Sequence, residues 1–311
     1  FTELSDYFYR IVSYFVKGEM TDEYGFIHKR EKGPVPNLKY FQVLNEPNLW
    51  TSVEYYTKLY DAIVGRLSSE FPHLKFVGME QSSMGTPENY EYFLNPKNHM
   101  DGVPYDWVSF HFYASPNSST DAKEISLAFN KVDTSLVPKI EAISNQRSKY
   151  APDVKLSLDE VGLSFGASIS YDTFTDMNWQ AANSFFTYAY FKTAHLVQSA
   201  QVSQLHGYPL LFPGSTMVKW DTGVPNAKYW GLKLLMQTSS VDDMLYITET
   251  NNNATTFAQA LEKKDGSRLV VIVNKSPEKQ TYVVEESSGK TFKYIDLSTV
   301  SSMDQTKSVV V

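Results

Sequence analysis

The sequence contains no cysteine, and this absence removes several kinds of chemistry at once. Without thiols there can be no disulfide, no zinc–thiolate site and no cysteine nucleophile. Histidine is also scarce, and none of the spacings is typical of a metal site such as HxH or HExxH. The six histidines are His28, His73, His99, His111, His195 and His206. We therefore expect no metal and no cofactor, and a metal-dependent enzyme is the least supported alternative.

Excess basic charge and long apolar runs are lacking too. The formal net charge is −7 and the pI is about 5.4, whereas nucleic acids and anionic membranes favour basic patches. No run approaches the roughly 18 apolar residues of a membrane span. We expect neither a nucleic-acid partner nor a membrane span, and the oligomeric state cannot be read from the sequence.

The chain has enough apolar residues to form a large core. It contains 311 residues, of which 42% are hydrophobic and 14% aromatic. Three glycosylation sequons begin at Asn117, Asn253 and Asn274, which favours a secreted, extracellular or lysosomal protein. No signal peptide is visible. Because the chain opens on Phe1 inside a helical pattern, we expect its true start to lie upstream.

Helices and strands are predicted to alternate over residues 1–238, which calls for a parallel sheet. The expected strands are 39–44, 74–79, 107–112, 154–158 and 201–205. The expected helices are 4–16, 53–69, 90–94, 121–149, 178–198 and 226–236. From about residue 241 short β-rich runs follow, at 253–261, 268–273, 280–284 and 291–295. They predict a small antiparallel β-sandwich as a second domain over residues 239–311.

Two glutamates end apolar, strand-like runs 114 residues apart (160 − 46). Glu46 stands in Leu-Asn-Glu-Pro-Asn after strand 39–44, and Glu160 in Leu-Asp-Glu-Val-Gly after strand 154–158. Hydrolysis of a glycosidic bond needs two carboxyl groups. In β/α barrels such groups converge at the C-terminal ends of strands.

The ordered motifs resemble a known group of enzymes. Asn-Glu-Pro-Asn at 45–48, Ser-Phe-His-Phe-Tyr at 109–113, and the stretch from Met217 to Trp230 together resemble the retaining glycoside hydrolases of clan A, especially family 39 and its neighbours. The resemblance covers roughly residues 1–240. It implies a (β/α)8 TIM-barrel-type catalytic domain, and an oligosaccharide, polysaccharide or glycoconjugate as substrate.

The resemblance also implies roles for individual residues. Glu46 would be the general acid/base and Glu160 the nucleophile, with the carboxyl groups about 5–5.5 Å apart. Asn45 would bind the sugar 2-hydroxyl. Strand alternation places Asp159 on the opposite face from Glu160, so we expect Asp159 to point at the helix layer as a structural hydrogen-bonding residue.

Other residues are open to two interpretations. The resemblance implies that His111 and Tyr113 flank the nucleophile, with Tyr113 donating to Glu160 and His111 lining the cleft. Alternatively, both are ordinary core residues. Glu80 is either a substrate contact or a surface charge. The tryptophan of the family's eighth strand has no clear match, and Tyr208 or Trp220 is the alternative sugar platform.

The strand count departs from the family pattern, because five barrel strands are visible where eight are needed. The chain resembles the last five β/α units, with strands one to three missing. We expect an open sheet with exposed apolar surface, prone to association and weakly active alone. Two functions therefore stay open: a retaining glycosidase, or an inactive carbohydrate-binding remnant of one.

Overall fold

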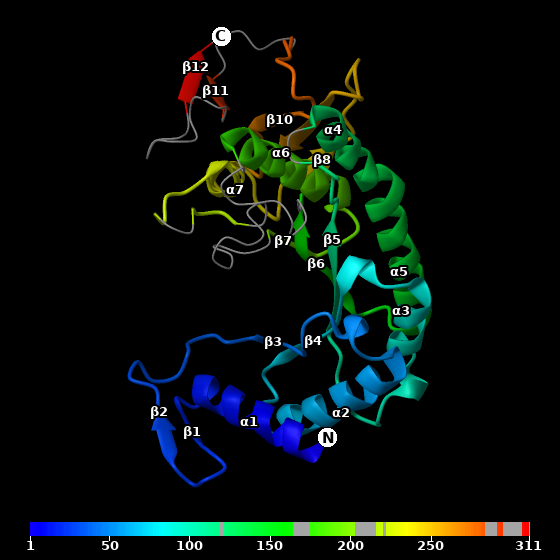
Figure 1. Cartoon of the computed structure of the whole chain (residues 1–311), viewed down its shortest axis with the longest axis vertical. Coiled ribbons are helices and arrows are strands. Elements are labelled where there is room, and N and C mark those ends of the chain that lie inside the picture. The colour runs from blue at the N-terminus through cyan, green and yellow to red at the C-terminus, as the bar shows by residue number, and fades with distance from the viewer. Residues whose placement is uncertain are drawn as a thin grey trace. The chain divides into compact units, whose positions relative to one another are not determined.

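The computed structural model describes residues 1–118, 121–163, 175–202, 216–219, 222–283, 291–294 and 307–310. The chain divides into two compact units. The first contains residues 1–112, 139–159 and 196–199, and the second contains residues 113–138, 160–195 and 200–311. Figure 1 labels the helices and strands. None of the described helices is both long and apolar enough to cross a membrane.

A five-stranded sheet in the order β3-β4-β5-β6-β7 forms the centre of the fold. Its strands are β3 (Tyr40–Gln42), β4 (Lys75–Gln81), β5 (Trp107–Tyr113), β6 (Lys155–Gly162) and β7 (Ser199–Val202). Strand β3 pairs with β4, and β4 with β5, in parallel. Each strand begins within two residues of its predicted start, so the parallel α/β class is confirmed.

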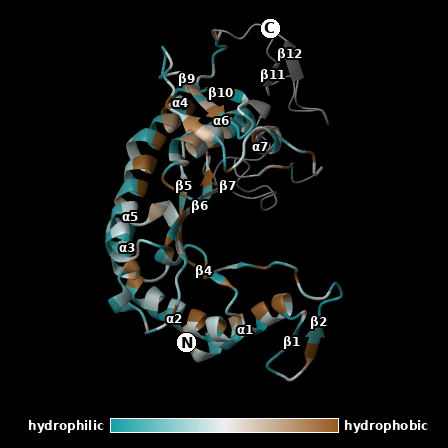
Figure 2. Ribbon diagram, turned by 180° about the vertical axis from the view of Figure 1, so that it is seen from behind, coloured by the Kyte–Doolittle hydropathy of each residue, from teal (hydrophilic) through white to brown (hydrophobic). Residues whose placement is uncertain are grey.

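Two helices of the first unit begin directly after a residue whose side chain caps the helix start. The helices of this unit are α1 (Thr2–Val16), α2 (Val53–Glu70), α3 (Pro87–Leu94) and α5 (Val137–Tyr150). Ser52 caps α2 by accepting from the Tyr55 amide, and Thr86 caps α3 in the same way. In Figure 2 apolar (brown) residues recur along α1 among polar ones, which is the pattern of a half-buried helix.

Buried aromatic rings fill the first unit between α2 and α3. Tyr56 and Tyr60 of α2 and Phe93 of α3 have almost no exposed surface, and the Tyr60 and Phe93 ring centroids lie 5.0 Å apart. A Cβ at position 78 of β4 would come within 2.6 Å of Phe93, so this close approach of helix and strand requires Gly78. The aromatic layer thus fixes α2 and α3 against the strands.

The second unit combines helices with antiparallel strands. Its helices are α4 (Ala122–Lys131), α6 (Asp176–Thr193) and α7 (Ala227–Thr238). The sheet β8-β9-β10 is built from Met244–Tyr246, Thr256–Glu262 and Arg268–Asn274. A further antiparallel pair joins β11 (Thr291–Tyr294) and β12 (Lys307–Val310). A small antiparallel C-terminal sheet is therefore present.

Several elements differ from the sequence prediction. The first unit contains an unpredicted hairpin, β1 (Glu19–Thr21) with β2 (Ile27–Lys29). The single helix expected over 121–149 is interrupted by a π-turn, Val132–Leu136, directly before α5. Residues 280–283, within an expected strand, are not in a strand. Short 3-10 turns occur at Pro47–Leu49, Ser82–Met84 and Pro96–Asn98.

Candidate active site

The strand-end loop that carries Glu46 has an unusual backbone. Leu44 has a φ of 66° and Glu46 a φ of 47°, both in the left-handed region that side chains other than glycine rarely adopt. Pro47 follows at once and starts the 3-10 turn Pro47–Leu49. The Glu46 side chain is 24% exposed, so its carboxyl group is partly withdrawn from solvent. Strain of this kind concentrates at functional sites.

A second strained segment brings Glu80 inward at the end of β4. The pairing of β4 with β5 is irregular between Gly78 and Gln81, and the intervening Met79 and Glu80 have φ values of 77° and 42°. This bulge turns the Glu80 carboxylate towards buried surroundings, where its side chain is 13% exposed. Glu80 is therefore not the surface charge that was one of its two interpretations.

Two hydrogen-bonding groups hold these strained segments together. The buried Tyr56 hydroxyl donates to the Val43 carbonyl at 3.0 Å and accepts from the Met79 amide at 3.0 Å. Asn48 accepts from the Ser82 amide at 2.9 Å and donates to the Ser82 carbonyl at 3.2 Å. Each group joins the end of β3 to the end of β4, so the backbones around Glu46 and Glu80 are fixed relative to one another.

His111 of β5 is fully buried and lies among carboxyl groups. Its Nδ1 is 2.9 Å from Glu46 Oε1, while its Nε2 is 3.6 Å from Asp159 Oδ1 and 3.8 Å from Glu80 Oε1. Only the first of these distances is that of a hydrogen bond. Burial without access to water makes the charges of the surrounding carboxylates effective at this ring.

The position of Asp159 corrects the expectation that it faces the helix layer. Its Oδ2 accepts a hydrogen bond of 2.6 Å from Gln42 Nε2 of β3, and its Oδ1 approaches His111. Regular alternation would separate Asp159 from His111, so the strand ends depart from a regular pleat here. Asp159 is the hydrogen-bonding residue that was predicted, but with partners on β3 and β5. Burial raises the pKa of the Asp159 carboxyl, and the neighbouring His111 acts in the opposite direction.

In the second unit, Tyr113 and Glu160 form a short hydrogen bond. The Tyr113 hydroxyl donates to Glu160 Oε2 at 2.6 Å, the distance of a charge-assisted bond. The Ala114 amide donates to the Gly162 carbonyl at 3.1 Å, which joins the two strand ends. Tyr113 thus makes the contact that was expected of it. A phenol that donates to a carboxyl group fixes the orientation of that group.

The three remaining predicted residues are Asn45, Tyr208 and Trp220. Asn45 is exposed, on the same loop as Glu46. Tyr208 and Trp220 lie outside the described residues. Sequence reasoning assigned no role to Gln42, Asn48 or Tyr56, although Asn48 ends the motif at 45–48, because their partners come from distant segments.

The side chains of Glu80, His111 and Asp159 could in principle surround a cation, since their ligand atoms lie within 4.8 Å of one another. Asp159 already accepts from Gln42, and His111 Nδ1 already faces Glu46. We therefore interpret this set as a hydrogen-bonding and charge network.

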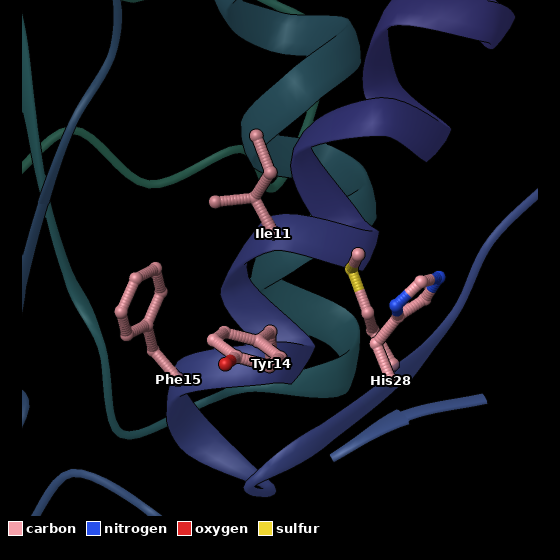
Figure 3. Close-up of a pocket in the computed structure, with 5 residues that line it drawn as sticks. Ile11, Tyr14, Phe15 and His28 are labelled. Carbon is pink, nitrogen blue, oxygen red and sulfur yellow. The ribbon is translucent and has the colours of Figure 1, made fainter. Parts of the chain in front are cut away.

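Two pockets lie among other residues. In the first unit, a pocket of about 230 Å³ lies between α1 and the β1–β2 hairpin. Figure 3 shows Ile11, Tyr14, Phe15 and His28 around it. In the second unit, a pocket of about 490 Å³ lies along α7, beside Tyr229 and Met236. Neither contains a carboxylate, so neither offers the paired acids of a glycosidase.

Comparison with known proteins gives the class of fold. No protein-family profile and no curated protein matches the sequence. Solved structures do match. The GH51 arabinofuranosidase from Xanthomonas axonopodis pv. citri has a TM-score of 0.65 at 16% identity, over 93% of this chain and 60% of the enzyme. A glucosidase from Croceicoccus marinus has a TM-score of 0.60 at 17% identity, over 99% of this chain and 58% of the enzyme.

A GH39 β-xylosidase from Caulobacter crescentus gives a TM-score of 0.52 at 17% identity, over 84% of this chain and 52% of the enzyme. The chain is thus similar in fold to glycoside hydrolases of families 39 and 51, as the sequence motifs suggested. Its sheet corresponds to part of a TIM barrel. The chain spans between about half and three fifths of the length of these proteins.

Proposed function

We propose that the chain carries the catalytic residues of a retaining glycosidase, with Glu46 as general acid/base and Glu160 as nucleophile. The observation that supports this most directly concerns β5. His111 contacts the Glu46 carboxyl at 2.9 Å, and Tyr113, two residues later, donates to Glu160 at 2.6 Å. One strand therefore supplies a partner for each of the two carboxyl groups that the reaction needs.

The two contacts suit different roles. The phenol donor of Tyr113 fixes the orientation of the Glu160 carboxyl group, as suits a nucleophile. A histidine can exchange a proton with Glu46, as suits a group that first gives and then takes one. The distance between the two carboxyl groups stays a prediction.

The reaction would have two steps. In the first, the Glu160 carboxylate attacks the anomeric carbon, the glycosidic C–O bond breaks, and Glu46 gives its proton to the leaving oxygen. In the second, Glu46 takes a proton from water, the water oxygen bonds to the anomeric carbon, and the bond to Glu160 breaks. The configuration is inverted twice and so retained. Substrates would be oligosaccharides, polysaccharides or glycoconjugates, and Asn45 would bind the sugar 2-hydroxyl.

A second candidate is an inactive carbohydrate-binding remnant of such an enzyme. The number of strands in the main sheet favours it. Five strands are found in it among the described residues, and a closed barrel has eight. We propose that these are the last five β/α units of such a barrel, followed by a β-sandwich. The missing units would supply walls of the sugar-binding cleft. A secreted or lysosomal location also stays a proposal.

Substitution of the two glutamates tests the proposed function. The longest available gene product, carrying any upstream β/α units, is first screened against a panel of nitrophenyl glycosides. On the best substrate, Glu160→Ala should abolish turnover, and azide should restore it as a glycosyl azide of inverted configuration. Glu46→Ala should spare substrates with good leaving groups, which need little protonation, and azide should give the retained configuration.

The stereochemistry of the azide products decides between the assignments. Interchanged products would reverse the roles of Glu46 and Glu160. Absence of any activity in the longest product, with a folded protein that still binds sugars, would favour the inactive remnant.

A further inference from the structure

The backbone at Glu46 has a conformation that the local sequence disfavours. Its φ is 47° and its ψ is 50°, which is the left-handed region. Side chains other than glycine rarely adopt this region, and the residue before a proline, here Pro47, favours extended backbone instead. A conformation of this kind persists only where the surrounding structure over-determines it. Contacts with other segments must therefore hold Glu46 in place.

Left-handed residues are concentrated at two neighbouring strand ends. In the part of the chain that the structure describes, seven residues other than glycine have a positive φ. Six of them lie at or directly after the ends of β3 and β4, namely Leu44, Glu46, Met79, Glu80, Ser83 and Met84. The side chains that connect these two strand ends are thus the ones that stabilise both strained segments.

Asn48 makes such a connection on the far side of Glu46. Its Oδ1 accepts from the Ser82 amide at 2.9 Å, and its Nδ2 donates to the Ser82 carbonyl at 3.2 Å. One side-chain amide thus binds both backbone groups of one residue, which fixes its orientation as well as its distance. The loop after β4 is held from the helix side too, because Lys139 of α5 donates to the Ser83 carbonyl at 3.3 Å.

The anchor on the near side of Glu46 is different. There the Tyr56 hydroxyl binds the Val43 carbonyl, before the strained residues begin. Pro47 has no amide hydrogen and adds no anchor of that kind. The hydrogen bond from the Leu49 amide to the Glu46 carbonyl is internal to the segment, so it does not fix the segment against β4. Without Asn48, the segment could relax towards extended backbone and turn the Glu46 carboxyl group away.

We propose that Asn48 is a positioning residue for the proton donor. Its two hydrogen bonds to Ser82 hold the Glu46 carboxyl group where it can protonate the leaving-group oxygen. This inference rests on the proposed function, in which Glu46 is the general acid/base. Asn48 touches no reacting atom in that mechanism. Its loss should therefore impair protonation of the leaving group more than it impairs attack by Glu160.

Aryl glycosides of one sugar, with leaving groups from dinitrophenol to phenol, test this role on the longest available gene product. Good leaving groups need little protonation, whereas poor ones depend on the acid. In Asn48→Ala we expect kcat/KM to fall by about 10- to 100-fold for the phenyl glycoside and by less than about threefold for the dinitrophenyl glycoside, because a misplaced acid costs rate only where it acts. No fall, or an equal fall for all leaving groups, would overturn the proposal.

Asn89 provides the matched control. Its Nδ2 donates to Gln81 Oε1 at 3.2 Å, so Asn89→Ala also removes a hydrogen bond to the end of β4, but one that does not involve the Glu46 segment. This variant should keep the leaving-group dependence of the parent. If Asn89→Ala selectively lost activity on the phenyl glycoside as well, general loosening of the strand end would explain the result, and the role of Asn48 would be rejected.

Hydrogen exchange, followed by nuclear magnetic resonance on the 311-residue chain, gives a readout that needs no activity. The Ser82 amide should exchange slowly in the parent and in Asn89→Ala, and faster in Asn48→Ala. Free exchange of this amide in the parent would overturn the proposal even if Asn48→Ala does not fold. A protected Ser82 amide in a longest gene product without any glycosidase activity would instead reject the proposed function, and with it the catalytic role of Asn48, while leaving the geometry intact.

Discussion

The hydroxyl of Tyr113 donates to the carboxyl group proposed as nucleophile. The hydrogen bond of 2.6 Å is short, and it fixes the direction of the Glu160 side chain. At the scale of single residues, we expect loss of the Tyr113 hydroxyl to lower activity while leaving the stability of the fold almost unchanged.

Tyr113→Phe removes that donor and keeps the ring. We expect kcat/KM on a nitrophenyl glycoside to fall by about 10- to 100-fold, because the nucleophile loses a stabilising donor. The unfolding midpoint in urea should change little. Tyr150→Phe is the matched control, because the Tyr150 hydroxyl also donates to a carboxylate at 2.6 Å, that of Glu91 in the first unit. Equal loss of activity in both variants would contradict the assignment.

At the scale of elements, helix α2 controls the geometry of two strand ends through a single hydroxyl. Tyr56→Phe would leave the Val43 carbonyl and the Met79 amide buried and without their present partner. Such a loss costs about 1–3 kcal/mol, measurable as a lower free energy of unfolding in urea. Activity should fall as well, since the backbones of Glu46 and Glu80 lose their connection.

Tyr60→Phe, one turn further along α2, separates the effect on stability from the effect on activity. Tyr60 is just as buried, but its hydroxyl donates to the Pro104 carbonyl, which belongs to neither strand end. This variant should lose stability and keep its activity. If both variants lost activity equally, control of the strand ends by Tyr56 would be disproved.

A buried lysine in helix α7 leads us to expect that the free energy of unfolding depends on pH. Lys228 is fully buried there, and burial lowers its pKa from 10.5 to about 7. Below pH 7 the folded chain carries a buried ammonium group. Between about pH 7 and 10.5 the unfolded chain binds a proton that the folded chain does not, so this group makes the free energy of unfolding rise with pH.

Lys228→Met should remove that contribution. Compared with the parent, the variant should be more stable near pH 6 by a few kcal/mol, on the order of 3–5, and the difference should shrink towards pH 10. Urea unfolding at pH 6, 8 and 10 measures it. Lys233→Met, at an exposed position of the same helix, should give a difference that does not vary with pH. Parallel curves for Lys228→Met and the parent would refute the prediction.

Elements buried on one or both faces could be predicted from the sequence, and exposed ones could not. The β1–β2 hairpin and β8 carry mostly exposed side chains, so they have no alternation to detect. The π-turn before Pro138 was hidden because apolar spacing continues through it. At the site, the motifs identified Glu46, His111, Tyr113 and Glu160. The inward turn of Glu80 and the partners of Asp159 depend on backbone angles and distant contacts that periodicity does not encode.

At the scale of the whole molecule, the described part of the chain leaves one edge of its main sheet exposed. β3 is the first strand in the sheet order, and its Tyr40 is 53% exposed. Unpaired strand edges with apolar side chains are templates for association. The chain covers 52% and 60% of the length of two of the solved structures to which it is similar.

The 311-residue chain alone should therefore form oligomers, visible by light scattering after size-exclusion chromatography. Tyr40→Lys should reduce association, because a charge on an edge strand discourages pairing. Ile27→Lys, on the exposed hairpin, adds the same charge at a position away from this edge and should have a smaller effect. A monodisperse parent chain with full glycosidase activity would show that the barrel strands have been miscounted.

The left-handed angles of Glu46 and Glu80 have a consequence for protein engineering. Glycine adopts such angles without steric cost, whereas other residues lose about 1 kcal/mol or more there. A search for thermostable variants that ranks substitutions by backbone compatibility would therefore favour glycine at these two positions. It would select against the two carboxyl groups that face His111, so positions 46 and 80 should be held constant in any stabilised library.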